Sequence, residues 1–313
     1  MALKLAVVTA GAVGAYFGGR LAQAGVEVRF LARGAHLAAL KEQGLRVQSS
    51  SGDFSLKPSD YFVTQDAAEV VRGADLVFFA VKSFDTEASA RALLPGLDAK
   101  TVVISLQNGV ENEAILSTIL GPERVAAGSA YIEATLDGPG AIKHRSLGRL
   151  ATAIHTEAGQ PVPLLDELKA RSEAAGFSLT LAEDGLTLKW SKLVFISAFS
   201  GWTTAARRAS DGIMAEPELR EAYRATLLET ATIAQAAGAK IDPAEVAKQN
   251  FAFSEKLQGM SSSMLYDFEQ GKSIEVDALN GAVVRKGREL GLPTPYNQAL
   301  LALLTANSPK EIK

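Results

Sequence analysis

A short turn near the N-terminus has the residue types and spacing of a loop that holds the phosphates of a dinucleotide. It reads Thr9-Ala10-Gly11-Ala12-Val13-Gly14 and follows an apolar run. Glycine suits such a loop because a Cβ would keep a pyrophosphate away from the backbone N–H groups that begin the next helix, where the helix dipole favours an anion. Gly11 and Gly14 fill the second and third glycine positions, and Thr9, which is β-branched and stiff, replaces the first. The alternative interpretation is that the glycines only let a helix pack closely on a sheet.

The end of the second predicted strand indicates which dinucleotide the loop would hold. NAD-preferring sites usually carry Asp or Glu there to accept a hydrogen bond from the ribose 2′-hydroxyl, whereas a cation accommodates a 2′-phosphate. Arg33 occupies this position, and no acidic residue lies between Phe30 and Leu40. We therefore expect NADPH rather than NADH. The alternative is that Arg33 is only a solvated arginine in a surface loop.

Two predicted buried strands, over residues 74–81 and 101–106, are each followed by a polar residue that could face a ligand. Lys82 follows the first strand and Asn108 follows the second. The carboxyl ends of neighbouring strands line one crevice in an open α/β sheet, so we expect both side chains near the nicotinamide half of the cofactor. The alternatives are a solvated lysine and an asparagine that only forms a turn or a helix cap.

A lysine at the head of an apolar helical stripe is the candidate proton donor. Lys192, Ile196 and Ser200 are spaced i, i+4 and i+8, which places them on one face of a predicted helix. A lysine held against apolar surface loses hydration, which lowers its pKa and makes it a better proton donor near neutral pH. The alternative is a lysine that extends along the helix to solvent.

Periodicity predicts a two-domain chain, an α/β Rossmann-type domain over residues 1–181 followed by an all-helical domain over residues 182–313. The first domain alternates strands and helices, with a small excursion around residues 45–63 that contains a strand over 53–63. Its last elements are predicted to be strands over 124–132, 141–145 and 148–154, a helix over 162–175 and a strand over 177–181. Six helices are predicted in the second domain, over residues 185–208, 217–238, 243–257, 264–270, 274–290 and 297–306.

Composition excludes several classes of protein and of site. At 313 residues, with 47% apolar and 21% charged residues and a net charge of −3, nothing indicates binding to nucleic acid or to an anionic membrane. There is no cysteine, and His36, His144 and His155 lie too far apart in sequence for metal-ligand spacing, so no metal is expected.

The apolar N-terminus could pass for a signal peptide, but its glycines have loop spacing and it runs on into the second strand. We expect a soluble, cytoplasmic protein.

Taken together, these motifs resemble those of the ketopantoate reductase (2-dehydropantoate 2-reductase) family over nearly the whole chain. The residues that carry the resemblance are Gly11-Ala12-Val13-Gly14 with Gly18-Gly19, Arg33, Val81-Lys82-Ser83, Gln107-Asn108-Gly109-Val110, Trp190-Ser191-Lys192-Leu193, Ser262-Ser263-Met264-Leu265-Tyr266-Asp267, Glu275-Val276-Asp277 with Asn280-Gly281, and Gly291-Leu292-Pro293-Thr294-Pro295. The resemblance implies NADPH-dependent reduction of ketopantoate to pantoate, on the route to pantothenate and coenzyme A. It leaves open whether the protein is a homodimer.

The resemblance also implies roles for individual residues. Lys192 corresponds to the general acid that protonates the carbonyl oxygen, and Glu275 to the acid that orients the substrate hydroxyl and the lysine. Asn108 and Lys82 match residues near the nicotinamide and the substrate. Ser263 matches a substrate-binding serine, and Arg33 matches the contact to the 2′-phosphate. The loop from Thr9 to Gly14 would hold the pyrophosphate.

Two positions depart from the family pattern and bear on the substrate. Typical members carry asparagines four and eight residues after the lysine, where this chain has Ile196 and Ser200. A substrate polar group buried against Ile196 without a partner would cost roughly 1–3 kcal/mol. Three hypotheses therefore remain: reduction of ketopantoate or a close analogue, action on an unrelated 2-oxo or 3-hydroxy acid, and nucleotide binding without turnover. Retention of Lys192 and Glu275 argues against the third, because neither is needed merely to bind NADPH.

Overall fold

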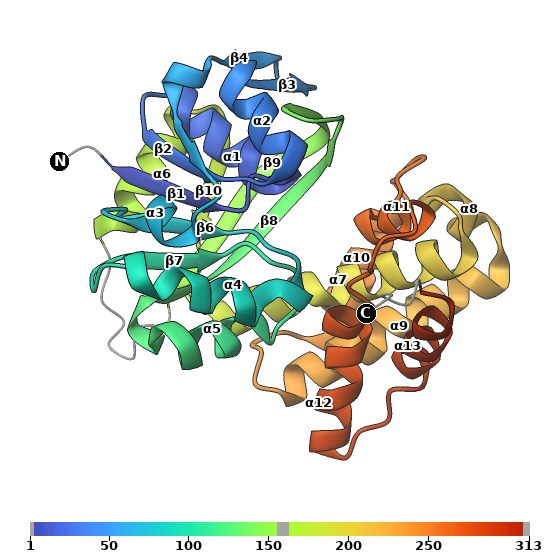
Figure 1. Cartoon of the computed structure of the whole chain (residues 1–313). Helices are drawn as coiled ribbons and strands as arrows, with labels where there is room; N and C mark the ends of the chain where they lie inside the picture. The colour runs from blue at the N-terminus through green and yellow to red at the C-terminus, as the bar shows by residue number, and fades with distance from the viewer. Residues whose placement is uncertain (1–2, 155–162, 309–313) are drawn as a thin grey trace. The chain divides into compact units, whose positions relative to one another are not determined.

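The computed structural model describes residues 3–154 and 163–308, which form two compact units. One unit comprises residues 1–107 and 112–188, and the other comprises residues 108–111 and 189–313. Figure 1 labels the elements of both units along the chain. The sequence places a domain boundary after residue 181, whereas this division falls inside helix α7 (Gly185–Ala206). His155 and the expected first residue of the 162–175 helix lie outside the described residues.

Six parallel strands of the first unit have the strand order of a Rossmann fold. The sheet contains the order β5-β2-β1-β6-β7-β8, in which the third strand of the parallel set lies outermost and the first lies at the centre. The strands are β1 (Lys4–Val8), β2 (Glu27–Leu31), β5 (Phe62–Thr64), β6 (Leu76–Phe79), β7 (Val102–Ser105) and β8 (Val125–Leu136). Strands covered on both faces read as continuous apolar runs, and all four residues of β6 are buried. The expected α/β, Rossmann-type class is confirmed.

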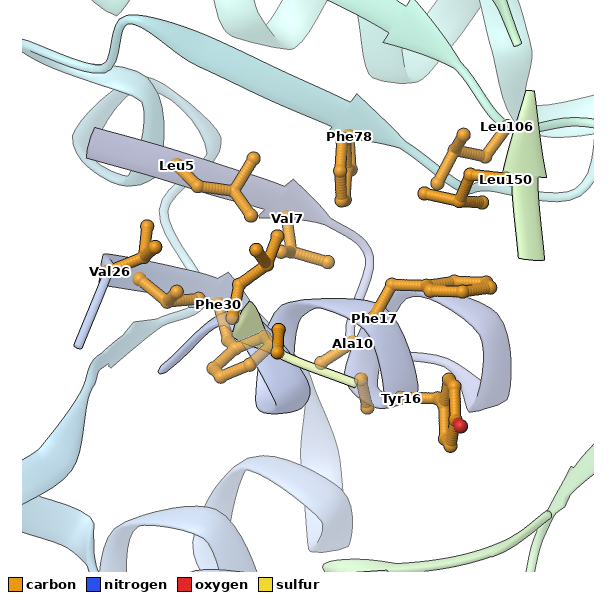
Figure 2. Close-up of a cluster of buried hydrophobic side chains, with 14 of the residues drawn as sticks. Leu5, Val7, Ala10, Tyr16, Phe17, Val26, Phe30, Phe78, Leu106 and Leu150 are labelled. Carbon is orange, nitrogen blue, oxygen red and sulfur yellow. The ribbon is translucent and has the colours of Figure 1, made fainter. Parts of the chain in front are cut away.

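The two faces of this sheet carry separate apolar clusters. Leu5 and Val7 of β1 belong to one cluster, and Ala6 and Val8 belong to the other, as the two-residue period of a strand requires. Figure 2 shows the first cluster, in which Phe17 of helix α1 (Ala12–Gln23) lies among strand residues. The other helices of this unit are α2 (Gly34–Glu42), α3 (Ala67–Val71), α4 (Thr86–Leu93), α5 (Asn112–Leu120) and α6 (Pro163–Ala174).

The remaining strands correct two sequence expectations. Strands predicted over residues 141–145 and 148–154 form one strand, β9 (Ala141–Ile154), antiparallel to β8. The glycine at position 148 has a φ of 110° beside shifts in the β8–β9 register, so it belongs to an irregularity within the strand rather than to its end. β3 (Leu45–Ser49) and β10 (Ser178–Leu181) both pair with β9.

The segment predicted as one strand over residues 53–63 forms two strands with different partners. β4 (Phe54–Leu56) pairs antiparallel with β3, and β5 pairs parallel with β2. A 3₁₀ turn over Pro58–Asp60 separates them. Proline has no N–H to donate to a ladder, which explains why the strand is interrupted there.

The second unit is helical, as expected, with its core around Trp190, Leu193, Tyr223, Leu227 and Val283. Its helices after α7 are α8 (Ser210–Ala215), α9 (Pro217–Ala236), α10 (Pro243–Ser254), α11 (Ser263–Glu269), α12 (Ala282–Leu290) and α13 (Pro295–Asn307). The six-residue helix α8 was not predicted, because so short a segment shows little periodicity.

The helix predicted over residues 274–290 differs at its start. Helical structure begins at Val276, and residues Asp277–Gly281 form a π-helical turn before α12. Glu275 therefore precedes the helix instead of lying in its first turn, which corrects the sequence expectation. Among the described residues, no helix is both long and apolar enough to cross a membrane.

Candidate active site

Two glycines in the loop after β1 have different roles: the fold requires one of them, and the other leaves room for a ligand. A Cβ on Gly14 would lie 2.3 Å from the carbonyl oxygen of Thr9 and 2.7 Å from Val7 Cγ1, so Gly14 is required by packing. A Cβ on Gly11 would meet only Thr9 Oγ1, at 3.9 Å. Gly11 is the N-cap of α1 and provides no side-chain cap, so it leaves the N–H groups of the first turn to another acceptor. This arrangement fits a dinucleotide phosphate.

The same distinction applies further along α1. A Cβ on Gly18 would come within 2.8 Å of Phe30 Cε1 and of Val7 Cγ2. Gly18 therefore brings the helix close to the sheet, which is the packing interpretation of the glycines. The structure supports that interpretation for Gly14 and Gly18 and leaves Gly11 as the loop glycine with space beside it.

The carboxyl ends of β1 and β6 define the point where the strand order reverses, which is where dinucleotides bind in this class of fold. Thr9 and Ala10 follow β1 directly, and the Ala10 N–H donates to the Leu31 carbonyl at the end of β2 (2.8 Å). Arg33 is exposed two residues beyond β2, as the N-cap of α2. Lys82 is half-buried and follows β6. These four residues, with Ala12 and Val13 in the half-buried start of α1, occupy the positions that the sequence assigns to them.

A buried threonine, Thr86, contacts the residues on both sides of the Asn108 segment. Thr86 Oγ1 accepts a hydrogen bond from Gln107 Nε2 (2.7 Å) and lies 3.1 Å from Asn112 Oδ1. It also donates to the carbonyl oxygen of Ser83 (2.8 Å). Thr86 thereby holds residues 107 and 112 within the sheet unit, whereas the intervening residues 108–111 belong to the helical unit.

The helical unit contains both candidate catalytic side chains, and both are buried. Lys192 on α7 is 8% exposed, and Glu275 is also 8% exposed. Asn280 Nδ2 donates to the carbonyl of Ser197 on α7 (3.1 Å) and to Asn297 Oδ1 on α13 (2.9 Å). Because Asn280 belongs to the π-helical turn, these bonds attach the segment after Glu275 to the α7 turn that follows Lys192. The sequence analysis did not assign this role to Asn280.

Ile196 and Ser200, one and two turns beyond Lys192 on α7, differ in exposure. Ile196 is half-buried and Ser200 is 6% exposed. One turn before Lys192, a second lysine, Lys189, is also buried. Sequence reasoning overlooked Lys189, and its position three residues before Lys192 was the available signal.

The two serines at the start of α11, Ser262 and Ser263, have different surroundings. Ser262 is buried and is the N-cap of α11, where its Oγ accepts from the Leu265 N–H (3.0 Å) and from Thr203 Oγ1 (2.8 Å). Ser263, the residue predicted to bind substrate, is exposed. Its hydroxyl is therefore accessible to a ligand, while Ser262 is committed to the fold.

An arginine that the sequence analysis did not single out holds the Asn108 segment within the helical unit. Arg285 on α12 donates from Nε to Glu111 Oε1 (3.0 Å) and from Nη2 to Glu111 Oε2 (2.7 Å). Its Nη1 donates to Asp277 Oδ1 (2.7 Å). The hydrogen bonds that Arg285 donates to Glu111 chiefly, and to Asp277, raise the pKa of Arg285. No local pattern in the sequence indicates this pair, because 174 residues separate Arg285 from Glu111.

A Rossmann-type sheet whose first loop fits a dinucleotide phosphate, and a helical unit with a buried lysine and glutamate, are the arrangement expected of a nucleotide-dependent oxidoreductase. Residues 5–157 match the family model described as ketopantoate reductase PanE/ApbA, and residues 184–308 match the model of its C terminal part. The chain belongs to the ketopantoate reductase family.

Individual relatives cover nearly the whole chain. The 2-dehydropantoate 2-reductase of Archaeoglobus fulgidus is 32% identical over 306 residues, which cover 96% of each protein. The crystal structure of a PanE/ApbA family ketopantoate reductase from Ralstonia eutropha has a TM-score of 0.87 and 35% identity, and the match covers 97% of this chain and 98% of that one. A D-mandelate dehydrogenase, solved with NADH and anilino(oxo)acetate, has a TM-score of 0.88 over 97% of this chain and 98% of its own. Its identity is 22%, so this last similarity is one of fold.

Proposed function

We propose that this protein is an NADPH-dependent reductase that converts ketopantoate to pantoate, in the synthesis of pantothenate and coenzyme A. The observation that carries the proposal is the buried Lys192 on a helix to which the Glu275 segment is attached through Asn280 and Ser197. A buried lysine on a helix that is hydrogen-bonded to a carboxylate-bearing segment is the arrangement expected of a general acid and the group that orients it. In this proposal residues 1–181 bind the nucleotide and residues 182–313 bind the acid.

The chemistry requires one hydride and one proton for each carbonyl group. When bound by the residues named above, NADPH would supply the hydride for C2 of the 2-oxo acid. Lys192 Nζ would donate its proton to the carbonyl oxygen as the negative charge develops there. Glu275 orients the substrate hydroxyl and the lysine. Asn108 and Lys82 position the nicotinamide and the substrate, and Ser263 donates a hydrogen bond to the substrate.

The cofactor assignment depends on the residues that fit each part of the molecule. The N–H groups that begin α1 suit the pyrophosphate, and the absence of a Cβ at Gly11 leaves the close approach it needs. Arg33, exposed just beyond β2, suits a 2′-phosphate better than a 2′-hydroxyl. NADPH is therefore the proposed cofactor, although the D-mandelate dehydrogenase of similar fold was solved with NADH.

A second candidate function is reduction of a different 2-oxo acid. It is favoured by Ile196 and Ser200, which replace two asparagines and remove amide groups that could pair with a hydroxyl of ketopantoate. Ile196 is only half-buried, so its side chain is accessible to a ligand. A 2-oxo acid with an apolar side chain in place of the hydroxyl would avoid an unpaired polar group at this position.

The test is an absorbance assay of NADPH and of NADH oxidation by the purified protein, with ketopantoate and a panel of apolar and aromatic 2-oxo acids. The proposal expects turnover of ketopantoate with NADPH and a higher kcat/KM for NADPH than for NADH. Turnover of other acids only would support the second candidate. NADPH binding without turnover of any acid would mean that the chain binds the nucleotide but is not a reductase of these acids.

A further inference from the structure

Three charged side chains of the helical unit contact one another, and the family resemblance gives none of them a role. Arg285 pairs with both carboxylate oxygens of Glu111 and with one carboxylate oxygen of Asp277. Its Nη2 also donates to the main-chain carbonyl of Asp277 (2.9 Å). We call this set, Glu111, Asp277 and Arg285, the arginine clamp.

The clamp joins two segments that each carry a proposed site residue. Glu111 ends the segment 108–111, which begins with Asn108 and belongs to the helical unit. Asp277 lies two residues after Glu275, at the start of the π-helical turn. Four hydrogen bonds from one planar guanidinium fix both the distance and the orientation of the two segments, which a point charge would not do.

The backbone is shaped to accommodate the clamp. A Cβ on Gly281 would lie 2.7 Å from Asp277 Oδ1 and 3.1 Å from Arg285 Nη1. Its φ of −62° is an ordinary helical value that any residue can adopt. Space for the ion pair, rather than backbone conformation, therefore explains glycine at this position.

Stability alone is a weak reason for this arrangement. The side chains of Arg285, Glu111 and Asp277 are 42%, 44% and 75% exposed, and exposed ion pairs add little to folding stability. The same geometry is well suited to holding a loop in one position, because a bidentate pair limits rotation as well as distance.

We propose that Arg285 is a positioning residue that holds the Asn108 segment in register with Glu275. The inference rests on the proposed function, since Asn108 and Glu275 act together only if the protein is a reductase. Loss of the clamp leaves Lys192 and the phosphate-binding loop intact but lets Asn108 move relative to Glu275. A displacement of about 1 Å at a reacting centre can lower the rate by up to about 100-fold.

The first test compares Arg285→Ala, Arg285→Lys and a matched control, Arg224→Ala, by steady-state kinetics. Arg224 lies on α9 of the same unit and forms a bidentate pair with the exposed Glu221, but neither residue adjoins a proposed site residue. We expect kcat to fall by about 10- to 100-fold in Arg285→Ala, with a smaller loss in Arg285→Lys. The Arg224→Ala enzyme should keep the wild-type kcat, and both alanine variants should lose similar, small amounts of thermal stability.

The second test measures hydrogen exchange of the backbone amides of residues 107–112 and does not depend on activity. Exchange should be faster in Arg285→Ala than in the wild-type chain and unchanged in Arg224→Ala. An unchanged kcat, or unchanged exchange in this segment, would overturn the proposal. If the wild-type chain reduces none of the acids, the proposed function fails, and exchange alone then decides whether Arg285 orders the segment.

Discussion

Gly11 and Gly14 stand in the same loop, yet a methyl group on each would meet different atoms. On Gly14 it would collide with the Thr9 carbonyl oxygen, while on Gly11 it would make only an ordinary contact with Thr9 Oγ1. The sequence pattern treats the two glycines alike, because spacing alone does not distinguish a packing glycine from one that admits a ligand. The distinction emerges only when the strand and helix are placed in three dimensions.

The glycine pair makes a prediction at the residue scale. Gly14→Ala should destabilise the sheet unit by about 1–3 kcal/mol, the usual cost of overpacking. Gly11→Ala should change stability by less than about 1 kcal/mol and should weaken NADPH binding, because its methyl group meets the ligand rather than the protein. Urea denaturation and titration of nucleotide fluorescence measure the two effects. Equal losses of stability in the two variants would contradict this interpretation.

The neighbouring serines of α11 make a second prediction at this scale. Ser262→Ala removes an N-cap and the acceptor of the Thr203 hydroxyl, and should cost about 1–2 kcal/mol of stability. Ser263→Ala should leave stability unchanged and raise KM for the 2-oxo acid. Thermal denaturation and steady-state kinetics of the two variants, made in parallel, separate the roles. A KM effect in Ser262→Ala alone would reverse the assignment.

At the scale of elements, long periodic segments were predicted well and local interruptions were not. Apolar runs such as β6, and helices such as α7 and α9, follow directly from hydrophobic pattern. The continuity of β9 through residues 147–148 and the separate partners of β4 and β5 depend on neighbouring strands far away in sequence. The π-helical turn after Glu275 likewise gave no periodic signal of its own.

The residues of the candidate site likewise divide into those that the sequence indicates and those that only the structure reveals. Lys192, Glu275, Asn108 and Arg33 could be named from motifs because the residues around them are close in sequence. The Arg285–Glu111 pair and the Asn280–Ser197 bond could not, since each joins residues that are distant in the chain and ordinary in type.

The contact between β3 and β9 includes a buried histidine, which predicts how folding stability depends on pH. His144 on β9 is buried, its Nδ1 lies 2.8 Å from Ser49 Oγ, and its Nε2 lies 3.1 Å from the Ser146 carbonyl. A carbonyl only accepts, so Nε2 carries the proton and Nδ1 accepts from the Ser49 hydroxyl. Burial, opposed in part by the hydrogen bond to Ser146, lowers the pKa of His144 below its ordinary value of 6.5.

The sign of the pH effect follows from this lowered pKa. Between the lowered folded pKa and 6.5, the unfolded chain binds the proton more readily, so stability rises with pH in that window and falls on acidification. His144→Gln should therefore reduce the loss of stability between pH 7.5 and pH 5, measured by urea denaturation at each pH. Burial also lowers the pKa of His36, so the dependence should shrink rather than vanish. A variant with the wild-type pH dependence would show that His144 does not contribute.

At the scale of the whole molecule, the two family models match residues 5–157, which lie mainly in the sheet unit, and residues 184–308, which lie mainly in the helical unit. The sheet unit carries the proposed phosphate-binding loop and Arg33. The helical unit carries Lys192, Glu275, Ser263 and the Asn108 segment. In the proposed reductase both units are needed, because the residues proposed for phosphate binding and for proton donation lie in different units.

The most direct test of the account is the rate of 2-oxo acid reduction by Lys192→Ala, compared with the wild-type chain and with Lys248→Ala as a matched control. Lys248 is an exposed lysine of α10 whose side chain is 81% exposed. The account predicts that Lys192→Ala lowers kcat by about 10²–10⁴, the usual contribution of a general acid, while NADPH binding and the Lys248→Ala rate stay near wild type. A Lys192→Ala enzyme that reduces the acid at the wild-type rate would contradict it.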